Sequence, residues 1–245
     1  MFRVINYMFM VVLFCLGGCK AEQETNILKF GVSADYPPFE YHSNNEIVGF
    51  DIDLAKLVAK EMGKEAVFVD MQFSSIFPAL TSDKIDLAIS TIAITDERSI
   101  HFDFSVPYYH EQIVVVSKKD NSILTKNELD NKKIACQIGS VFEVWLKNNI
   151  KTAQITAMND ANQAIESLKA GHVDCAILDA VQAMMFSSKN PGLSYSLIDQ
   201  AQNGYVLLLP KNSKLKQPVD QAILKLTSSG EIKKLEQKWI DQWKN

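Results

Sequence analysis

Arg98 and Asp179 are the charged residues whose positions best suit the binding of a small ion. Arg98 follows the apolar run 85–89 after a short polar segment, and Asp179 directly follows the apolar run 173–178. Short apolar runs of this kind are typical of buried strands. Ligands of open α/β sheets bind beyond the carboxyl ends of the strands. The two residues therefore predict a site with one cation and one anion, and a zwitterion fits both.

The side chain of Arg98 suits an anionic group. A guanidinium presents a rigid fork of N–H donors that matches a carboxylate through two charge-assisted hydrogen bonds. The turn 91–95, with the hydroxyl of Thr91, is placed to add donors or acceptors beside it. The alternative for a lone arginine is an ion pair at the surface, here with Asp96 or Asp103.

The second half of the chain offers groups for both ends of a zwitterion. Asp179 offers a carboxylate to an ammonium group. Gly139-Ser140 opens the predicted helix 141–148, and free amides at a helix start attract anions. Both features have a simpler alternative, because Asp and Ser at these positions are also common helix caps.

Tyr36 and Phe73 are the aromatic candidates for contacting a flat or cationic side chain through stacking and cation–π attraction. Two consecutive prolines keep the loop 33–41 from becoming helical and hold it extended, so it presents Tyr36 rigidly. The alternative is that both rings pack in a hydrophobic core, as we expect of Phe39 and Phe50.

A repeated pattern predicts two similar α/β lobes. Residues 80–89 and 168–177 place leucine, aspartate, alanine and isoleucine at the same spacing. Alternating strands and helices predict mostly parallel sheets with crossover helices. The expected strands are 28–32, 66–69, 85–89, 113–116, 133–138, 154–158 and 173–178, and the expected helices are 49–62, 75–82, 141–148, 161–169, 180–187, 215–227 and 231–243. The expected crossings are 118–130 and 205–209, which gives 27–117 plus 205–245 to lobe 1 and 118–204 to lobe 2.

The first residues predict an export signal rather than part of the fold. A basic start, an apolar run and small residues precede Cys19, and the run is shorter than the roughly 20 residues of a membrane span. Leu16-Gly17-Gly18-Cys19 resembles the cleavage box of bacterial lipoproteins, so we expect a signal peptide at 1–18, a lipid on Cys19 and a polar tether at 19–26. An ordinary signal with a chance cysteine is the alternative.

Composition disfavours nucleic-acid binding and gives no sign of catalysis. The formal charge of −4 becomes −5 when the single arginine of residues 1–18 is removed, so the exported part has no basic footprint. The four histidines show no metal-ligand spacing, and we expect no metal and no cofactor. Asp51 and Asp53 fit the start of a helix better than a catalytic pair. Cys136 and Cys175 are expected to be buried free thiols, with a disulfide as the alternative.

Several motifs together resemble one family. These are Tyr36-Pro-Pro-Phe39-Glu40, Gly49-Phe50-Asp51-Ile52-Asp53, Phe77-Pro78-Ala79-Leu80, Ile94-Thr95-Asp96-Glu97-Arg98, Gly139-Ser140 and Ile177-Leu178-Asp179. They look like the polar amino-acid-binding proteins of bacterial ABC importers, solute-binding protein family 3, and they resemble the arginine-binding and lysine/arginine/ornithine-binding members most. The resemblance covers the chain from about residue 27. It implies a two-lobed periplasmic-binding-protein-like fold of type II, in which each lobe is a mostly parallel sheet flanked by helices and two hinge strands close the lobes on a ligand.

The resemblance also implies roles for individual residues. Arg98 would hold the α-carboxylate of an amino acid with help from Thr91 and the Ser140 amide, and Asp179 would hold the α-ammonium. Tyr36 and Phe73 would sandwich the side chain, with Gln137 near its tip. The implied ligand-binding set is Arg98, Asp179, Thr91, Ala93, Ser140, Gly139, Tyr36, Phe73, Gln137 and Val141.

Two positions depart from the family pattern. The family usually has a hydroxyl residue where this chain has Ala93, and basic-ligand members often have an acid where this chain has Ser33. The acids that could substitute for the missing one are Asp35, Glu40, Asp70 and Glu111.

The resulting hypothesis is a monomeric, lipid-anchored receptor in the cell envelope, in the periplasm or on the outer face of the membrane. It would bind a polar, basic, arginine-like amino acid and deliver it to an ABC permease and ATPase. Two alternatives remain open: a dehydratase of the cyclohexadienyl or arogenate type on the same fold, and a ligand sensor without transport.

Overall fold

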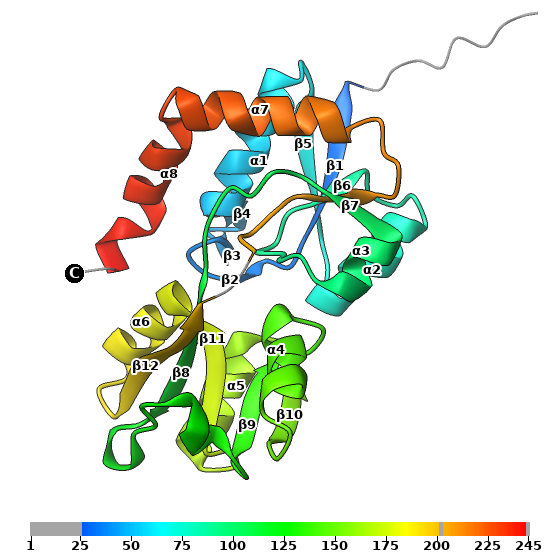
Figure 1. Cartoon of the computed structure of the whole chain (residues 1–245). Coiled ribbons are helices and arrows are strands. Elements are labelled where there is room, and N and C mark those ends of the chain that lie inside the picture. The colour runs from blue at the N-terminus through cyan, green and yellow to red at the C-terminus, as the bar shows by residue number, and fades with distance from the viewer. Residues whose placement is uncertain (1–25, 201–202, 244–245) are drawn as a thin grey trace, which may run out of the picture.

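The computed structural model describes residues 26–200 and 203–243. The expected leader 1–18 and Cys19 lie outside the described residues. The described chain forms two lobes, each built around a five-stranded sheet (Figure 1). Within the described ranges, no helix is both long and apolar enough to cross a bilayer.

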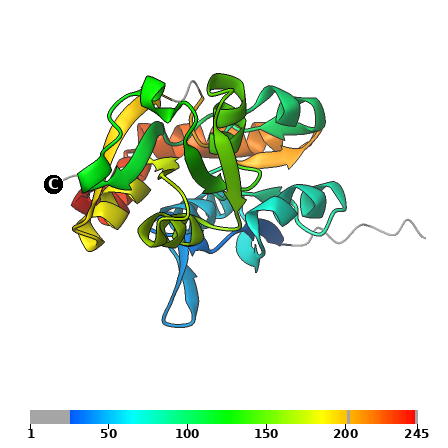
Figure 2. The same cartoon turned by 90° about the horizontal axis from the view of Figure 1, so that it is seen from below.

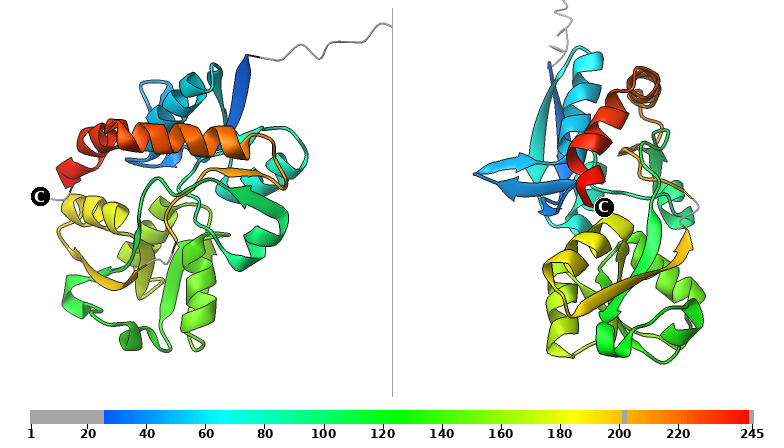
Figure 3. Two further views of the ribbon diagram at one scale, coloured as in Figure 1. Left: turned by 45° about the horizontal axis from the view of Figure 1, so that its top comes forward. Right: turned by 90° about the vertical axis from the view of Figure 1, so that its left-hand side faces the viewer.

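The first sheet mixes parallel and antiparallel strands. In spatial order its strands are β5 (Glu65–Asp70), β1 (Ile27–Val32), β6 (Leu87–Ala88), β13 (Leu208–Pro210) and β7 (Phe102–Phe104). Its helices are α1 (Phe50–Glu61), α2 (Phe73–Thr81), α3 (Asp96–His101), α7 (Lys216–Ser228) and α8 (Glu231–Trp239), followed by a 3-10 turn at Asp241–Trp243. β1 pairs parallel with β5 and β6, as expected, whereas β13 runs antiparallel to β6 and β7. α1, α7 and α8 pack together on one face of the sheet (Figure 3), and α2 packs on the other face.

The second sheet is covered on both faces. Its strands are β10 (Gln154–Met158), β9 (Lys133–Gln137), β11 (Cys175–Asp179), β8 (Gln112–Lys118) and β12 (Leu193–Gln200). Its helices are α4 (Val141–Asn149), α5 (Ala161–Ala170) and α6 (Ala180–Lys189). Alternate residues of β11 point to opposite faces, so Cys175 and Ile177 pack toward α4 while Ala176 and Leu178 pack toward α5 and α6. Cys136 and Cys175 are free and buried, as expected.

A small third sheet projects from the first lobe. It consists of β2 (Asp35–Tyr36), β3 (Glu40–Ser43) and β4 (Glu46–Val48), and its hairpin extends away from the body (Figure 2). Before the hairpin the loop turns tightly, because Phe39 N donates to Tyr36 O at 3.0 Å. A Cβ on Gly49, whose φ is 135°, would lie 2.1 Å from the carbonyl oxygen of Phe39, so glycine is required where α1 meets this loop.

The strand expected at 113–116 belongs to the second sheet, which corrects the expected first crossing. β8 runs antiparallel to both β11 and β12, so the chain leaves the first lobe before Gln112. Residues 118–130 instead carry two 3-10 turns, at Lys119–Asn121 and Lys126–Leu129. An apolar run indicates that a strand is buried but not which neighbours it pairs with. The small sheet β2 to β4, the strands β7 and β12, and the helix α3 were likewise not predicted.

Two crossing segments, 105–111 and 203–207, join the lobes and lie side by side. Tyr108 N donates to Tyr205 O at 2.9 Å, and Tyr205 N donates to Tyr109 O at 2.7 Å. A Cβ on Gly204 would lie 2.2 Å from the carbonyl oxygen of Tyr109, so only glycine allows this approach. The second segment overlaps the return crossing expected at 205–209.

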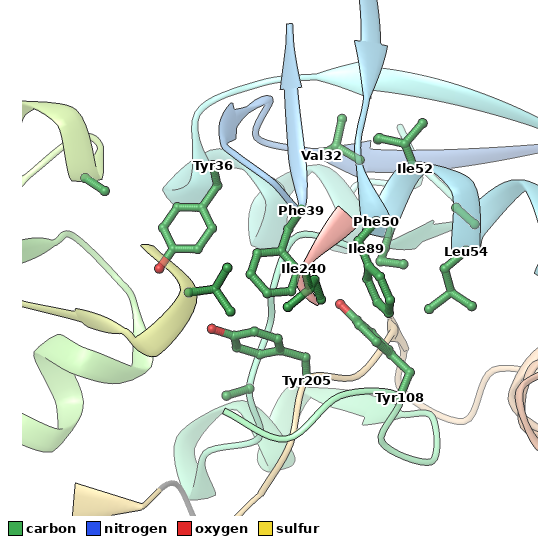
Figure 4. Packing of buried hydrophobic residues seen from close by; sticks show 14 of the residues in the cluster. Val32, Tyr36, Phe39, Phe50, Ile52, Leu54, Ile89, Tyr108, Tyr205 and Ile240 are labelled. Atoms are coloured by element: carbon green, nitrogen blue, oxygen red, sulfur yellow. The ribbon is translucent and has the colours of Figure 1, made fainter. Parts of the chain in front are cut away.

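A buried aromatic cluster anchors these segments to the first lobe. Phe39 contacts Phe50 and Tyr205 edge to face, with ring centroids 5.9 and 5.7 Å apart. Phe39 and Phe50 are fully buried, as expected. Figure 4 shows the Tyr36 and Tyr205 rings on either side of Phe39, with both hydroxyls pointing toward the second lobe.

Two buried carboxyl groups, Glu40 and Asp51, lie beneath the loop that follows β6. Glu40 accepts from Ser90 Oγ at 2.9 Å, and Asp51 accepts from Tyr108 Oη at 2.9 Å and Thr91 N at 2.9 Å. Each carboxyl keeps one buried oxygen without a donor among the described residues. A proton held between the two groups would satisfy both oxygens. Burial first and the charge of Asp51 second raise the pKa of Glu40. A hydrogen bond between the two carboxyl groups raises the pKa of Glu40 further and, against the effect of burial, lowers that of Asp51.

This pair predicts a stability that falls as pH rises. Because the pKa of Glu40 is higher in the folded than in the unfolded protein, the folded state holds more protons above about pH 4.5 and loses that advantage with increasing pH. Glu40→Gln should therefore flatten the pH dependence of the free energy of unfolding by at most about 1.4 kcal/mol per pH unit. Urea denaturation of both proteins at pH 5 and pH 8 measures the difference. Equal slopes for the two proteins would contradict a shared proton.

Candidate functional site

Arg98 is a buried cation that faces the second lobe. Only 8% of the residue is exposed. It lies in α3, whose N-cap Thr95 accepts from Arg98 N at 3.2 Å. Its guanidinium donates to the carbonyl oxygen of Ala93, and Nη2 donates to Gly139 O of the second lobe at 2.8 Å. Burial lowers the pKa of Arg98 to about 10.

Arg98 has no carboxylate partner, which rules out the surface ion pair as its explanation. None of the ion pairs within 4.0 Å between described residues includes Arg98, and Asp103 pairs with Lys211 instead at 3.5 Å. A guanidinium has five N–H donors, so the two bonds to carbonyl oxygens leave most of its capacity free. An unpaired buried charge is costly. The site therefore has capacity for an anion.

Two aromatic rings support the guanidinium. Its carbon lies 4.7 Å from the ring centroid of Phe77 and 5.8 Å from that of Phe73. Both residues belong to α2 and are four apart, so they lie on the same face of the helix. Phe73 is thus placed beside Arg98. Among the described rings, Tyr36 and Phe73 are not in contact.

Asp179 is the anionic counterpart on the other lobe. It is the last residue of β11, only 1% exposed, and it accepts from Gln182 N at 2.9 Å as the N-cap of α6. Tyr36 Oη of the first lobe donates to Asp179 Oδ2 at 2.5 Å. Asp179 therefore caps α6 and contacts the first lobe at the same time. Burial raises the pKa of Asp179, while the bond from Tyr36 lowers it.

Thr91 and Ala93 shape the backbone beside Arg98. Thr91 is β-branched and has a φ of 45°, a left-handed conformation that costs free energy for such a residue. The bond from its amide to Asp51 holds it there. Ala93 contributes its carbonyl oxygen to Arg98, so its missing hydroxyl does not remove it from the site.

The second lobe presents the turn that begins α4. Gly139 has a φ of 73° and directs its carbonyl oxygen to Arg98, while its amide donates to Glu143 at 2.6 Å. Ser140 caps α4 through its hydroxyl, which also donates to Gln137 O at 2.7 Å. The Ser140 amide donates to Gln137 O at 3.3 Å, a long bond that a better acceptor could replace. Gln137 Nε2 donates to Asn159 O at 3.3 Å, and Val141 is the partly buried first residue of α4.

Two of the four acids expected to substitute at Ser33 are already engaged. Glu40 bonds Ser90, and Asp70 bonds His42 at 2.7 Å and Ala34 N at 3.0 Å. Asp35 accepts a 3.3 Å bond from Ser33 Oγ, but its other oxygen is buried without a donor among the described residues. Both carboxylate oxygens of Glu111 are likewise buried without a donor within 3.5 Å among the described residues.

Asp35 of the first lobe interacts with the charge of a carboxylate on the second lobe. Burial raises the pKa of Asp35 to about 6, and the next cause is the negative charge of Asp160 on the other lobe. Asp160 caps α5 through Gln163 N at 2.8 Å. Two like charges brought together in this way suit a cation between them.

Three residues of this region were missed as functional candidates. Phe77 lies four residues after Phe73, but the predicted helix 75–82 began after Phe73, so the shared face of the two rings was not apparent until α2 was seen to begin at Phe73. Asp160 appears only as a helix cap in the sequence. Gln182, whose side chain donates to the carbonyl oxygen of Pro37 across the lobes, carries no signal at all.

Comparison with known proteins places the chain in a family. The bacterial extracellular solute-binding proteins, family 3, match residues 28–242. The arginine-binding extracellular protein ArtP of Bacillus subtilis is 34% identical over 87% of this chain and 86% of its own. A probable histidine-binding protein of Campylobacter jejuni is 37% identical over 77% of this chain and 74% of its own.

A solved structure agrees with this placement. The amino-acid ABC transporter substrate-binding protein AbpA of Streptococcus pneumoniae, bound to L-arginine, superposes with a TM-score of 0.81 at 36% identity, over 87% of this chain and 94% of its own. The expected two-lobed type II periplasmic-binding-protein fold is thereby confirmed. This chain belongs to family 3 of the bacterial extracellular solute-binding proteins.

Proposed function

We propose that this chain is the substrate-binding protein of an amino-acid ABC importer and that it closes on a basic amino acid, arginine or a close relative. The observation that carries the proposal is the guanidinium of Arg98, which is buried, faces the opposite lobe and has no carboxylate partner. An α-carboxylate would supply the missing anion through a bidentate pair. The relatives that bind arginine and histidine support a basic ligand.

The other groups of the cleft would complete the α-amino-acid end. Asp179 would take the α-ammonium, with Tyr36 orienting its carboxylate. The amide of Ser140 and the hydroxyl of Thr91 would add donors to the α-carboxylate. These roles use groups of both lobes, so one ligand holds the lobes together.

The side chain of the ligand would extend toward Asp35 and Asp160. The pKa of Asp35 is raised first by burial and second by the charge of Asp160, and a guanidinium placed between these carboxylates would relieve their repulsion. Tyr36 and Phe73 would flank the side chain, and Gln137 would lie near its tip. Asp35 would then replace the acid that is absent at Ser33.

The cellular setting is part of the proposal. Cys19 would carry a lipid anchor after removal of residues 1–18, and the protein would act as a monomer beside an ABC permease and ATPase. Sensing without transport differs in lacking such partners, so co-purification with a permease would favour import. Turnover of prephenate or arogenate would favour the alternative of a dehydratase on the same fold.

Replacement of Arg98 tests the carboxylate contact. Arg98→Ala should abolish binding of every amino acid that the native protein binds, because the α-carboxylate is common to all of them. Calorimetric titration of the exported domain with the common amino acids measures this, and circular dichroism checks that the variant is folded. A folded variant with native affinity would return Arg98 to a structural role.

Replacement of Asp35 tests the choice of a basic side chain. Asp35→Asn should weaken arginine binding about 10-fold, because a hydrogen bond to a charged group is lost. Binding of citrulline, which has the same shape but no charge, should change little. Asp120→Asn, at an exposed position on a 3-10 turn, is the matched control. An equal loss for both ligands would remove Asp35 from the specificity of the site.

Replacement of Phe77 tests the support of the guanidinium. Phe77→Leu should weaken binding about 3- to 30-fold, the effect of a lost cation–π contact of about 0.7–2 kcal/mol. Because Phe77 would act through Arg98, the factor should be the same for arginine and for any second amino acid that binds. Titration of the variant with both ligands measures it. A loss confined to arginine would place the ring against the ligand side chain instead.

A further inference from the structure

Glu111 is a buried carboxyl group that the proposed site has not used. It lies at the end of the first crossing segment, immediately before β8, and only 4% of the residue is exposed. Neither carboxylate oxygen accepts a hydrogen bond within 3.5 Å among the described residues, although the Tyr205 hydroxyl lies close enough to lower the pKa of Glu111. Buried polar atoms without a partner are costly, and they are uncommon outside functional sites.

The charged and titratable groups around Glu111 belong to the cleft. Arg98 of α3, Asp179 of β11 and Tyr36 of β2 each interact with its charge, as do three tyrosines of the crossing segments, Tyr108, Tyr109 and Tyr205. Burial raises the pKa of Glu111 to about 8; the Tyr205 hydroxyl and the charge of Arg98 oppose this increase, and the charge of Asp179 adds to it. The charge of Glu111 therefore interacts with both the cation and the anion of the cleft.

Glu111 and Asp179 face one space. Both border a cavity of about 630 Å³ beside the crossing segments, whose lining also includes His110, Gln112 and Val181. Asp179 already accepts from Tyr36 and from Gln182 N. An ammonium group has three donors, so Asp179 alone leaves donors for a second acceptor. Glu111 supplies that acceptor, because its two carboxylate oxygens can serve an ammonium donor as well as the Tyr205 hydroxyl.

We propose that Glu111 is a second carboxylate for the α-ammonium group of the bound amino acid and acts beside Asp179. This inference rests on the proposed function, because it assigns the α-ammonium to the Asp179 end of the cleft. It adds a ligand contact from the crossing segment 105–111 itself, so ligand binding at Glu111 would be coupled directly to closure of the lobes.

An orienting role for Glu111 toward Arg98 makes a different prediction. Such a role would affect the α-carboxylate end of every ligand, with or without an α-amino group. Arginine and 5-guanidinopentanoate, which is arginine without its α-amino group, therefore separate the two roles. Glu111→Gln keeps the shape of the side chain and removes its charge.

Calorimetric titration of the native protein and Glu111→Gln with both compounds is the test. The variant should bind arginine about 10- to 100-fold more weakly, as expected for a lost contact between charged groups, and should bind the deamino compound within about 3-fold of the native protein. Equal losses for both compounds, or no loss for either, would overturn the proposal. Glu166→Gln on α5, whose side chain is 68% exposed, is the matched control and should bind like the native protein.

Thermal melting of the ligand-free native protein and the Glu111→Gln variant gives a second, independent test. At pH 8.5 the ionised carboxylate of Glu111 is a cost to the folded protein, so Glu111→Gln should melt about 2–4 °C higher. A lower melting temperature would indicate a structural role and overturn the proposal. Glu111→Asp, which keeps the charge, should retain more arginine affinity than Glu111→Gln, and the reverse order would also contradict it.

Binding of amino acids by the native protein tests the proposed function, and the difference between the native protein and the Glu111 variants tests the role of Glu111. If arginine does not bind, the titrations are repeated with the amino acid that binds and its deamino counterpart. If no amino acid binds the native protein, the proposed function fails and this inference fails with it. If the native protein binds and the variants do not differ, only the role of Glu111 is lost.

Discussion

The burial of one guanidinium without a carboxylate partner is the constraint on which the rest of the site depends. Arg98 is buried between the lobes, and its hydrogen bonds to two carbonyl oxygens offset only part of the hydration that a guanidinium has in water. A ligand carboxylate would restore the balance of charge and hydrogen bonds at that point. The remaining features of the cleft can be understood as means of holding Arg98 in place and of presenting the complementary charge.

Holding Arg98 in place involves buried groups some distance from any ligand. Asp51 fixes the strained backbone at Thr91, and Glu40 holds Ser90 next to it. The two acids lie close together in the core, an arrangement that stability alone would not favour. These buried acids fix the path of the chain between β6 and α3, and that path determines the position of the Arg98 guanidinium. The strained backbone at Thr91 and the buried acids Glu40 and Asp51 thus both position Arg98.

The sequence could predict the residues at strand ends but not the partners that tertiary packing brings to them. Arg98 and Asp179 follow apolar strands, and that position alone indicated a cleft. The pairing of β8 with β11 could not be deduced, because an apolar run carries no information about its neighbours. For the same reason the sequence offered Glu111 only as one acid among several, and its burial and its interaction with the charges of Arg98 and Asp179 became visible only in the fold. Tyr36 and Asp179, 143 residues apart, meet for reasons that no local pattern contains.

The balance of charge in the cleft also bears on how closure is controlled. Arg98 is one cation, whereas Asp179, Glu111, Asp35 and Asp160 bring carboxyl groups from both lobes and the crossing segment toward the same gap. Burial first, and the negative charge of neighbouring carboxyl groups second, raise the pKa values of Asp35 and Glu111, so holding these groups in the gap without a cation costs free energy. A ligand with two cationic groups and one carboxylate complements the set far better than a neutral side chain does. Since a ligand shifts a conformational equilibrium only by its differential affinity for the two states, the proposed basic ligand would favour the closed state by neutralising these acids.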